Sequence, residues 1–176
     1  RLNSRIAETF PDSTHSVIRE GVARLADYQN SSYARGYLDR LEPVRTIDNG
    51  GPGGDHALTQ ETARYLALWM SPEDIVRVAD LKSRPERLTR IRSHVDARAG
   101  EPLRVTEFFN PGVEEWTAIL PAGLGRRARR AVERWGNAQA WNVALHIRST
   151  SVWGYLLLRL LANMRFLRAV SLGRAE

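Results

Sequence analysis

The sequence contains no cysteine among its 176 residues. The chain therefore has no disulfide, no cysteine-ligated zinc and no iron–sulfur cluster held by its own thiolates. The absence agrees with a reducing cytoplasm, which is the compartment that we expect. Whatever the chain does, it does without metal–thiolate chemistry.

Recognisable metal and catalytic motifs are also missing. The four histidines, at positions 15, 56, 94 and 146, have no spacing that presents two of them to one metal from one helix, and no HExxH or GxSxG motif is present. The acid pairs Glu73–Asp74 and Glu114–Glu115 fall in predicted first helical turns, where the helix dipole explains them. We therefore predict no catalytic residue, no metal site and no cofactor in this chain.

The glycine-rich stretch at residues 49–55 also lacks a key component. It contains four glycines and a proline, but it lacks the Lys-Ser/Thr that follows a phosphate-binding P-loop, and no clear strand precedes it. We interpret it as a flexible connection between two helices.

No apolar run is long enough to span a membrane. The most apolar stretch, residues 152–167, is short for a span and is interrupted by Arg159 and Arg165. We interpret it as a buried core helix. The sequence opens Arg1-Leu2-Asn3-Ser4, without a methionine or an apolar signal segment, so we expect a fragment of a longer subunit with no membrane contact.

The apolar periodicity predicts an all-α or nearly all-α fold, a compact multi-helix domain with about seven helices and at most two short strands. Residues 1–11 are expected to be an incoming linker or tail, and residues 12–176 a single helical domain. The predicted helices are a long one from residue 14 that bends near residues 30–32 and stops at Pro43, and others over about 57–70, 71–81, 84–95, 110–119, 121–136 and 151–167. The two predicted strands lie within residues 103–106 and 141–147.

Positive charge is concentrated in the second half of the chain. The net charge is +6, and residues 116–175 carry ten arginines against a single acid, Glu133. Five of these arginines lie on one predicted helix: Arg126, Arg127, Arg129, Arg130 and Arg134. Such a helix is a candidate basic interface for an anionic partner. We favour a solvated or inter-domain face over a nucleic-acid face, because no nucleic-acid-binding motif accompanies it.

A second candidate site is a corner where a predicted strand meets a helix N-terminus. Arg148, Ser149, Thr150 and Ser151 would meet there. Backbone N–H groups, hydroxyls and a guanidinium can together bind an anion. The alternative, which we favour, is an ordinary helix cap beside an arginine that pairs structurally.

Several strings resemble the C-terminal domain of the large subunit of indolepyruvate:ferredoxin oxidoreductases, from about residue 12 to the end. The most specific is MSPEDIVRVADLKSRPER at residues 70–87, followed by HIRSTSVWG at residues 146–154 and GVARLADYQ at residues 21–29. The other matching strings lie at residues 33–34, 37–41, 63–67, 105–108, 111–115, 120–121 and 124–127.

The resemblance implies a parent enzyme that decarboxylates aryl 2-oxoacids to acyl-CoA and passes electrons to ferredoxin. Thiamine diphosphate and iron–sulfur clusters are then expected elsewhere in that enzyme. This chain is expected to pack on, or close over, the catalytic domains without a self-contained active site. Its partners are expected to be the other domains and subunits of the parent enzyme, and its arginines are candidates to meet ferredoxin or coenzyme A.

Two other functions remain open. One is a basic, helical nucleic-acid-binding module, for which the arginine-rich half is the sequence signal. The other is an independent hydrolase or transferase with an unfamiliar site, which would need a deep pocket that joins Arg148, Ser149 and a carboxylate.

Overall fold

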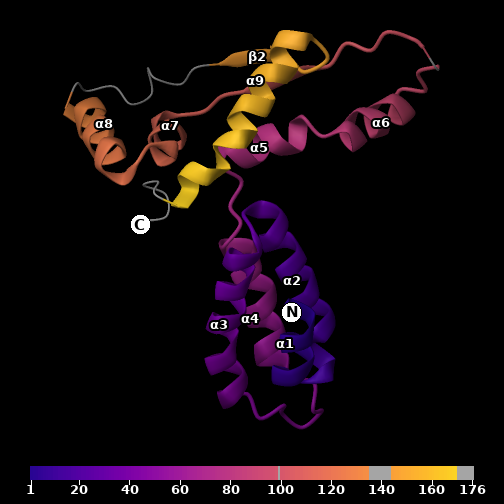
Figure 1. The fold of residues 1–176 in the computed structure, drawn as a ribbon, viewed down its shortest axis with the longest axis vertical. Coiled ribbons are helices and arrows are strands. Elements are labelled where there is room, and N and C mark those ends of the chain that lie inside the picture. Colours follow the sequence, from indigo (N-terminus) through magenta and orange to yellow (C-terminus); the bar gives the residue numbers. More distant parts are fainter. Residues whose placement is uncertain (99, 135–143, 170–176) are drawn as a thin grey trace. The chain divides into compact units, whose positions relative to one another are not determined.

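The computed structural model describes residues 1–98, 100–134 and 144–169. This part of the chain is mostly helical, as the periodicity predicts, with nine α-helices and one two-stranded antiparallel sheet (Figure 1). It divides into two compact units, unit 1 (Arg1–Pro72) and unit 2 (Glu73–Glu176), where the sequence predicted one domain. The count of about seven helices was low, because residues 2–9 form a helix and the long first helix is in fact two.

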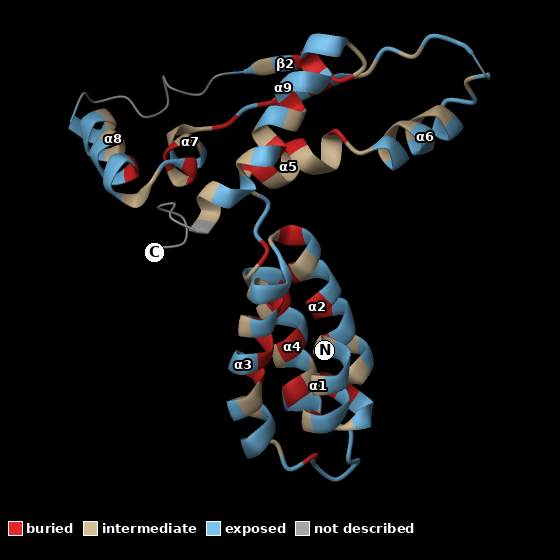
Figure 2. Cartoon of the chain, viewed as in Figure 1, coloured by how far each residue is buried: buried red, intermediate tan, exposed pale blue. Residues whose placement is uncertain are grey.

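Unit 1 is a bundle of four helices. Its elements are α1 (Leu2–Thr9), a 3-10 turn (Asp12–Thr14), α2 (His15–Tyr28), α3 (Ser31–Ile47) and α4 (Ala57–Trp69). The buried residues lie where these helices face one another (Figure 2). Fully buried side chains from three of them, Ile18 and Leu25 of α2, Tyr37, Leu38 and Leu41 of α3 and Ala63 of α4, belong to this core.

Residues 1–11 do not form the expected linker. Leu2, Ile6 and Phe10 recur every four residues, which places them on one face of a helix. Ile6 is fully buried and Phe10 nearly so, and both belong to the unit 1 core. On the polar side of α1, Arg5 forms ion pairs with Glu42 at 2.5 Å and Asp39 at 2.7 Å, so α1 is an integral part of the bundle.

The predicted bend near residue 30 is a complete break between two helices. Asn30 has extended backbone, and its side-chain oxygen accepts a hydrogen bond from the Tyr33 N–H at 2.9 Å, which caps α3. The predicted stop at Pro43 was wrong, since Pro43 lies inside α3 and the helix continues to Ile47. Pro43 is tolerated inside α3 because it is exposed and the helix ends about one turn after it.

Tyr37 connects three helices of unit 1. Its hydroxyl donates a hydrogen bond to the Ala63 carbonyl of α4 at 2.9 Å, and burial raises the pKa of this hydroxyl above its ordinary value. The ring and hydroxyl pass directly over Gly21 of α2. A Cβ at Gly21 would lie 2.5 Å from the Tyr37 hydroxyl oxygen, so only glycine leaves room for this contact.

Unit 2 contains the two strands and the remaining helices. Its elements are α5 (Ile75–Lys82), α6 (Pro85–His94), β1 (Thr106–Phe109), α7 (Val113–Ile119), α8 (Ala122–Arg134), β2 (Leu145–Arg148), α9 (Val152–Asn163) and a 3-10 helix, η3 (Met164–Ala169). The strands fall close to the two stretches that the sequence predicted, although residues 141–143 and the predicted end of α8 at 136–137 lie outside the described residues.

The start of α5 differs from the prediction. Ser71 does not cap it; the Ser71 hydroxyl donates back to the Ala67 carbonyl at the end of α4. Asp74 is the cap instead, and its carboxylate accepts from the Arg77 N–H at 2.6 Å. The same carboxylate pairs with Arg168 of η3 at 2.6 Å, so one acid both starts α5 and attaches η3.

The core of unit 2 lies where α5, α9 and the β1–β2 ribbon meet. Leu158 of α9 is fully buried against Ala79 of α5, Phe109 of β1 and Ile147 of β2. Glu107 pairs with Ile147 in the antiparallel register and is also nearly buried on this inner side. A second small core joins α5 to α7 and η3 through Val76, Ile119 and their neighbours.

The buried carboxylate of Glu107 is neutralised by two cations. Lys82, the last residue of α5, lies 2.7 Å from it, and Arg87 in the first turns of α6 lies 2.9 Å away. The Lys82 ammonium is also 4.6 Å from the centre of the Phe109 ring. Because a buried charge without a partner is strongly destabilising, this triad fixes α5 and α6 against β1.

The apolar helix α9 is not the buried core helix that the sequence predicted. Only Gly154, Leu158 and Ala162 are buried, at four-residue intervals along one narrow stripe. A Cβ at Gly154 would collide with the Arg148 carbonyl, so glycine lets α9 begin directly against the end of β2. Six other large apolar side chains of the helix are exposed: Val152, Trp153, Tyr155, Leu156, Leu157 and Leu160. Within the described residues, no helix is long and apolar enough to cross a bilayer.

We predict that Gly21→Ala destabilises unit 1 by about 1–3 kcal/mol, because the added methyl overpacks the buried Tyr37 ring. Gly36→Ala on α3 is the matched control, since its Cβ would meet only the mobile end of Arg40. That variant is expected to be neutral or to gain up to about 1 kcal/mol from helix propensity. Urea unfolding measures both, and equal stability of the two variants would contradict this packing.

Candidate functional site

The corner formed by Arg148, Ser149, Thr150 and Ser151 exists, but its hydroxyls are already engaged. The Ser151 side chain accepts from the Gly154 N–H at 3.1 Å and donates to the Arg148 carbonyl at 2.8 Å, so it caps α9 as predicted. The Thr150 hydroxyl accepts from the Val105 N–H, and the Ser149 hydroxyl donates to the Val105 carbonyl. The corner is a structural junction between the ribbon and α9.

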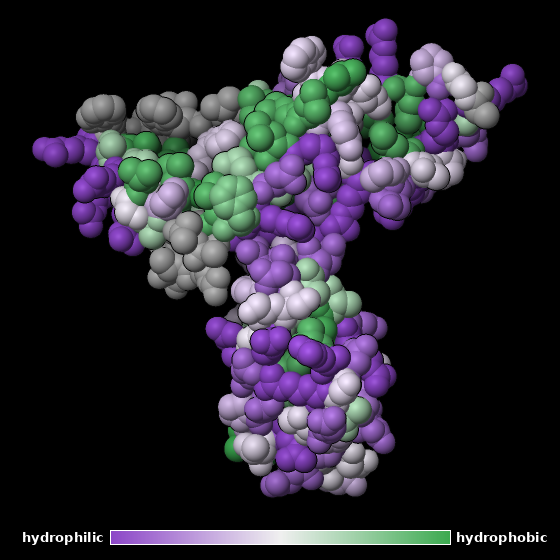
Figure 3. Space-filling model, viewed as in Figure 1, coloured by the Kyte–Doolittle hydropathy of each residue, from purple (hydrophilic) through white to green (hydrophobic). Residues whose placement is uncertain are grey.

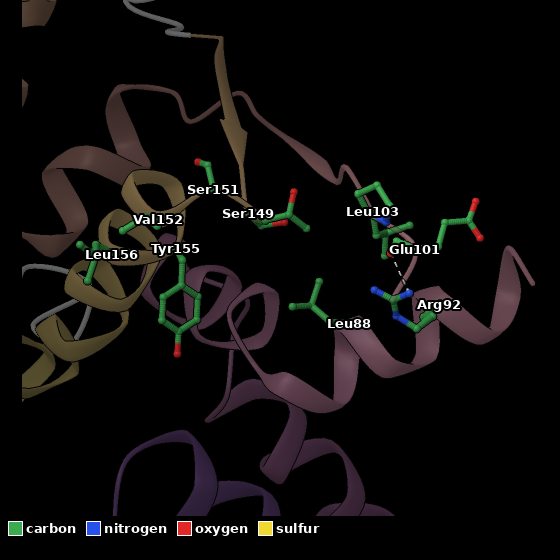
Figure 4. Close-up of a pocket in the computed structure, with 11 residues that line it drawn as sticks. Leu88, Arg92, Glu101, Leu103, Ser149, Ser151, Val152, Tyr155 and Leu156 are labelled. Atoms are coloured by element: carbon green, nitrogen blue, oxygen red, sulfur yellow. Dashed lines mark hydrogen bonds between the residues drawn. The ribbon is translucent and has the colours of Figure 1, made fainter. Parts of the chain in front are cut away.

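A cavity of about 540 Å³ lies beside this corner, within unit 2. Its walls are Val152, Tyr155 and Leu156 of α9 on one side and Leu88 and Arg92 of α6 on the other, with Ser149 and Ser151 between them (Figure 4). Pro102, Leu103, Glu101 and Thr150 complete the lining. Most of these side chains are apolar, so the cavity suits an apolar group.

The polar groups at the cavity serve the chain itself. Arg92 donates to the Glu101 carbonyl at 3.0 Å (Figure 4). It also donates to the Arg98 carbonyl at 3.0 Å, and the Glu101 carboxylate accepts from the Arg98 N–H. Ser149 and Glu101 both line the cavity, but no contact joins them among the described residues, and Arg148 is not among the lining residues. Because the Ser149 hydroxyl donates to a backbone carbonyl, it has no base to activate it, and we assign no catalytic residue.

The exposed face of α9 continues outward from the cavity. Trp153, Leu156, Leu157 and Leu160 follow the i, i+3, i+4, i+7 pattern of a helix interface, and they are between 43% and 81% exposed. Hydrophobic side chains follow α9 across the surface of unit 2 (Figure 3). Contiguous apolar surface of this kind marks an interaction site in most soluble proteins.

The five arginines of the candidate basic interface lie on α8. Arg126, Arg127, Arg130 and Arg134 are exposed, while Arg129 pairs with Glu133 at 3.3 Å on the other side of the helix. Arg127, Arg130 and Arg134 surround a hollow of about 390 Å³ with Ala131 at its floor. The structure thus brings three of the five together on one face.

The outward face of the ribbon carries a group of residues that sequence reasoning missed. Phe108 is 70% exposed, and its ring meets the His146 ring of β2 at 4.7 Å between centres, nearly at right angles. Arg148 pairs with Thr106 on the next rung of the same face. The alternation of exposed and buried residues along β1 and β2 is the sequence signal for this face. The strand predicted within residues 103–106 ended too early to include Phe108.

Comparison with known proteins gives a single family. The model of a family of unknown function (DUF6537) matches residues 14–175. The chain belongs to this family. No curated protein and no solved structure matches the chain.

The glycine-rich connection of this DUF6537 chain is organised by Asp48. The Asp48 carboxylate accepts from the hydroxyl of Thr59 at 2.6 Å, from its N–H at 2.8 Å and from the Gly50 N–H at 3.0 Å. It thereby supplies the cap that His56, the residue before α4, does not provide. Among the described residues no cluster of three metal-ligating side chains occurs, and His56 is 3.7 Å from Asp48 alone.

We predict that Ser151→Ala destabilises unit 2 by about 1 kcal/mol, the usual cost of a lost helix cap. Ser93→Ala, which removes an exposed hydroxyl late in α6, is the control and should change stability by less than about 0.5 kcal/mol. Thermal or urea unfolding checks both. A Ser151→Ala variant with wild-type stability would contradict the stabilising role of this cap.

We also predict that unit 1 loses stability in acid through Asp48. Hydrogen bonding, first from the Thr59 hydroxyl, lowers the pKa of Asp48 below its ordinary value. A carboxyl with a lowered folded-state pKa stabilises the fold above its unfolded pKa, and this contribution disappears as the pH falls through the folded value. Urea unfolding from about pH 6 to about pH 3 should therefore show a shallower acid loss for Asp48→Asn and for Thr59→Val than for wild type. Identical slopes in all three proteins would contradict the assignment.

Proposed function

We propose that this DUF6537 chain is an accessory interaction domain, and that the exposed face of α9 is where it packs on the catalytic part of its parent enzyme. The observation that supports the proposal is the row Trp153, Leu156, Leu157 and Leu160, which lies exposed on a well-packed helix. Burying one such side chain is worth about 1.5–3 kcal/mol, so four together can hold an inter-domain contact.

The cavity beside the corner supports the same role. Val152, Tyr155 and Leu156 belong both to the cavity wall and to α9, so the apolar surface is partly flat and partly concave. A partner that lies on α9 can insert one apolar side chain into the cavity. Apolar side chains that insert into a pocket on the partner are frequent anchors of protein interfaces.

The identity of the parent enzyme is proposed from the sequence resemblance. The parent is a cytoplasmic indolepyruvate:ferredoxin oxidoreductase, which holds thiamine diphosphate and iron–sulfur clusters in other domains. This chain contributes shape rather than chemistry. The exposed arginines of α8 are proposed to face an anionic partner of that enzyme, either the acidic surface of ferredoxin or the phosphates of coenzyme A.

The test uses the whole subunit that contains this chain. Wild-type subunit should reduce ferredoxin in the presence of indolepyruvate and coenzyme A. Leu160→Asp places a charge on the α9 face and should lower this activity at least about tenfold, because more than about 1.4 kcal/mol of docking energy is lost. Val95→Asp, at a similarly exposed apolar residue after α6, is the matched control and should keep wild-type activity.

Two results would contradict the proposal separately. A wild-type subunit that oxidises no aryl 2-oxoacid would contradict the proposed identity of the parent enzyme. It would not contradict the proposal that the α9 face is an interface. Equal activities of Leu160→Asp and Val95→Asp would contradict α9 as the docking face.

A further inference from the structure

The outward face of the β1–β2 ribbon combines rings and cations without acids. Side chains alternate along a strand, so Thr106 and Phe108 point to the same side as His146 and Arg148. Arg104 lies two residues before β1, next to this face in the sequence. Arg104, Thr106, Phe108 and Arg148 are exposed, and His146 is exposed as well. The acid of β1, Glu107, points inward, where Lys82 and Arg87 neutralise it.

Neither Arg104 nor Arg148 is neutralised within the part of the chain that the structure describes. The ion pairs of unit 2 involve other residues, such as Arg84 with Asp80 and Arg168 with Asp74. The surroundings are also cationic, since unit 2 contains eighteen basic and eleven acidic residues, whereas unit 1 contains eight and nine. The whole positive charge of the chain thus belongs to the unit that contains the ribbon.

We propose that this face binds a nucleotide unit, with the base stacked on Phe108 and the phosphate held by Arg148 and Arg104. The rung of Phe108 and His146 and the rung of Thr106 and Arg148 are two residues apart, about 6.8 Å along the strand. At that separation the Arg148 guanidinium can lie beside a base that stacks on Phe108, where it can reach the phosphate of the same nucleotide. A base offers a flat surface to the ring, and its phosphate offers bidentate acceptors to arginine.

Other partners use only half of this face. An acidic protein surface would pair with Arg104 and Arg148 but leave the exposed Phe108 ring without a role. An apolar protein surface would cover Phe108 but bury both guanidiniums without counter-charges, which is costly. A nucleotide satisfies the ring and the cations together, and ring stacking on an exposed β-ribbon is a common way to bind unpaired bases.

The His146 ring contributes by bracing Phe108. The two rings meet at an interplanar angle of 70°, an edge-to-face arrangement that restricts the rotation of the Phe108 ring. A braced ring loses little freedom when a base stacks on it. This is an advantage over a freely rotating exposed side chain.

The experiment measures fluorescence anisotropy of a labelled single-stranded DNA of about ten nucleotides against the 176-residue chain. Phe108→Ala should weaken binding about 5- to 150-fold, the usual effect of removing a stacking ring. Phe166→Ala removes a ring of similar exposure, 68% against 70%, from η3 and is the matched control. Phe108→Trp should retain binding, and circular dichroism checks that all three variants are folded.

The arginines are tested through the salt dependence. Arg104→Gln combined with Arg148→Gln should reduce the slope of log affinity against log salt by about 1.4, for two lost contacts to a single strand. Arg90→Gln combined with Arg98→Gln changes the net charge equally and should alter the slope much less. An equal effect of the two double variants would mean that binding follows net charge alone, which overturns the proposal.

Competition distinguishes the two sources of a nucleotide. If AMP displaces the labelled strand, the site binds a free nucleotide. If only an unlabelled strand displaces it, the site binds a nucleic-acid chain. Both results support the proposal. It is overturned if no binding occurs at low salt, if Phe108→Ala and Phe166→Ala bind equally, or if Arg126→Gln with Arg130→Gln on α8 removes binding while the ribbon variants do not.

Discussion

The packing of Leu158 onto Ala79, Phe109 and Ile147 is the contact on which the rest of unit 2 depends. It holds α9 against α5 and the ribbon through one narrow stripe. Because Phe109 and Ile147 must point inward to meet Leu158, Phe108, His146 and Arg148 must point outward. Because α9 buries only this stripe, most of its other apolar side chains remain exposed. The packing of this one buried leucine is therefore tied to both the outward face of the ribbon and the exposed face of α9.

The polar groups of the candidate sites are engaged within the chain itself. The hydroxyls that looked available for an anion, Thr150 and Ser151 among them, hold the ribbon to α9 instead. The buried acid Glu107 is balanced by Lys82 and Arg87 and lies away from the cavity lining. Among the described residues, the features left exposed are apolar area on α9, arginines on α8, and rings with arginines on the ribbon, and such features suit binding.

The sequence predicted the helices whose signals are local. The periodicity of residues 57–70, Pro85 at the start of α6 and the hydroxyl cap of α9 all hold in the structure. The predicted helix boundaries were wrong where the boundary depends on a contact or a position that the local sequence does not specify. Pro43 is tolerated because the helix ends soon afterwards, and Asp74 rather than Ser71 caps α5 because Ser71 bonds backwards. The exposure of α9 could not be predicted from the sequence, because the pattern of a helix that is apolar on most sides does not indicate which side is buried.

We propose that the exposed face of α9 is an interface in the parent subunit. Trp153 reports on it most directly, since it is 81% exposed in this chain. Oxidative footprinting can compare the modification rate of Trp153 in the 176-residue chain and in the whole subunit, each normalised to free tryptophan. We expect rapid modification of Trp153 in the 176-residue chain and strong protection of Trp153 in the whole subunit. Equal modification of Trp153 in both proteins would contradict it.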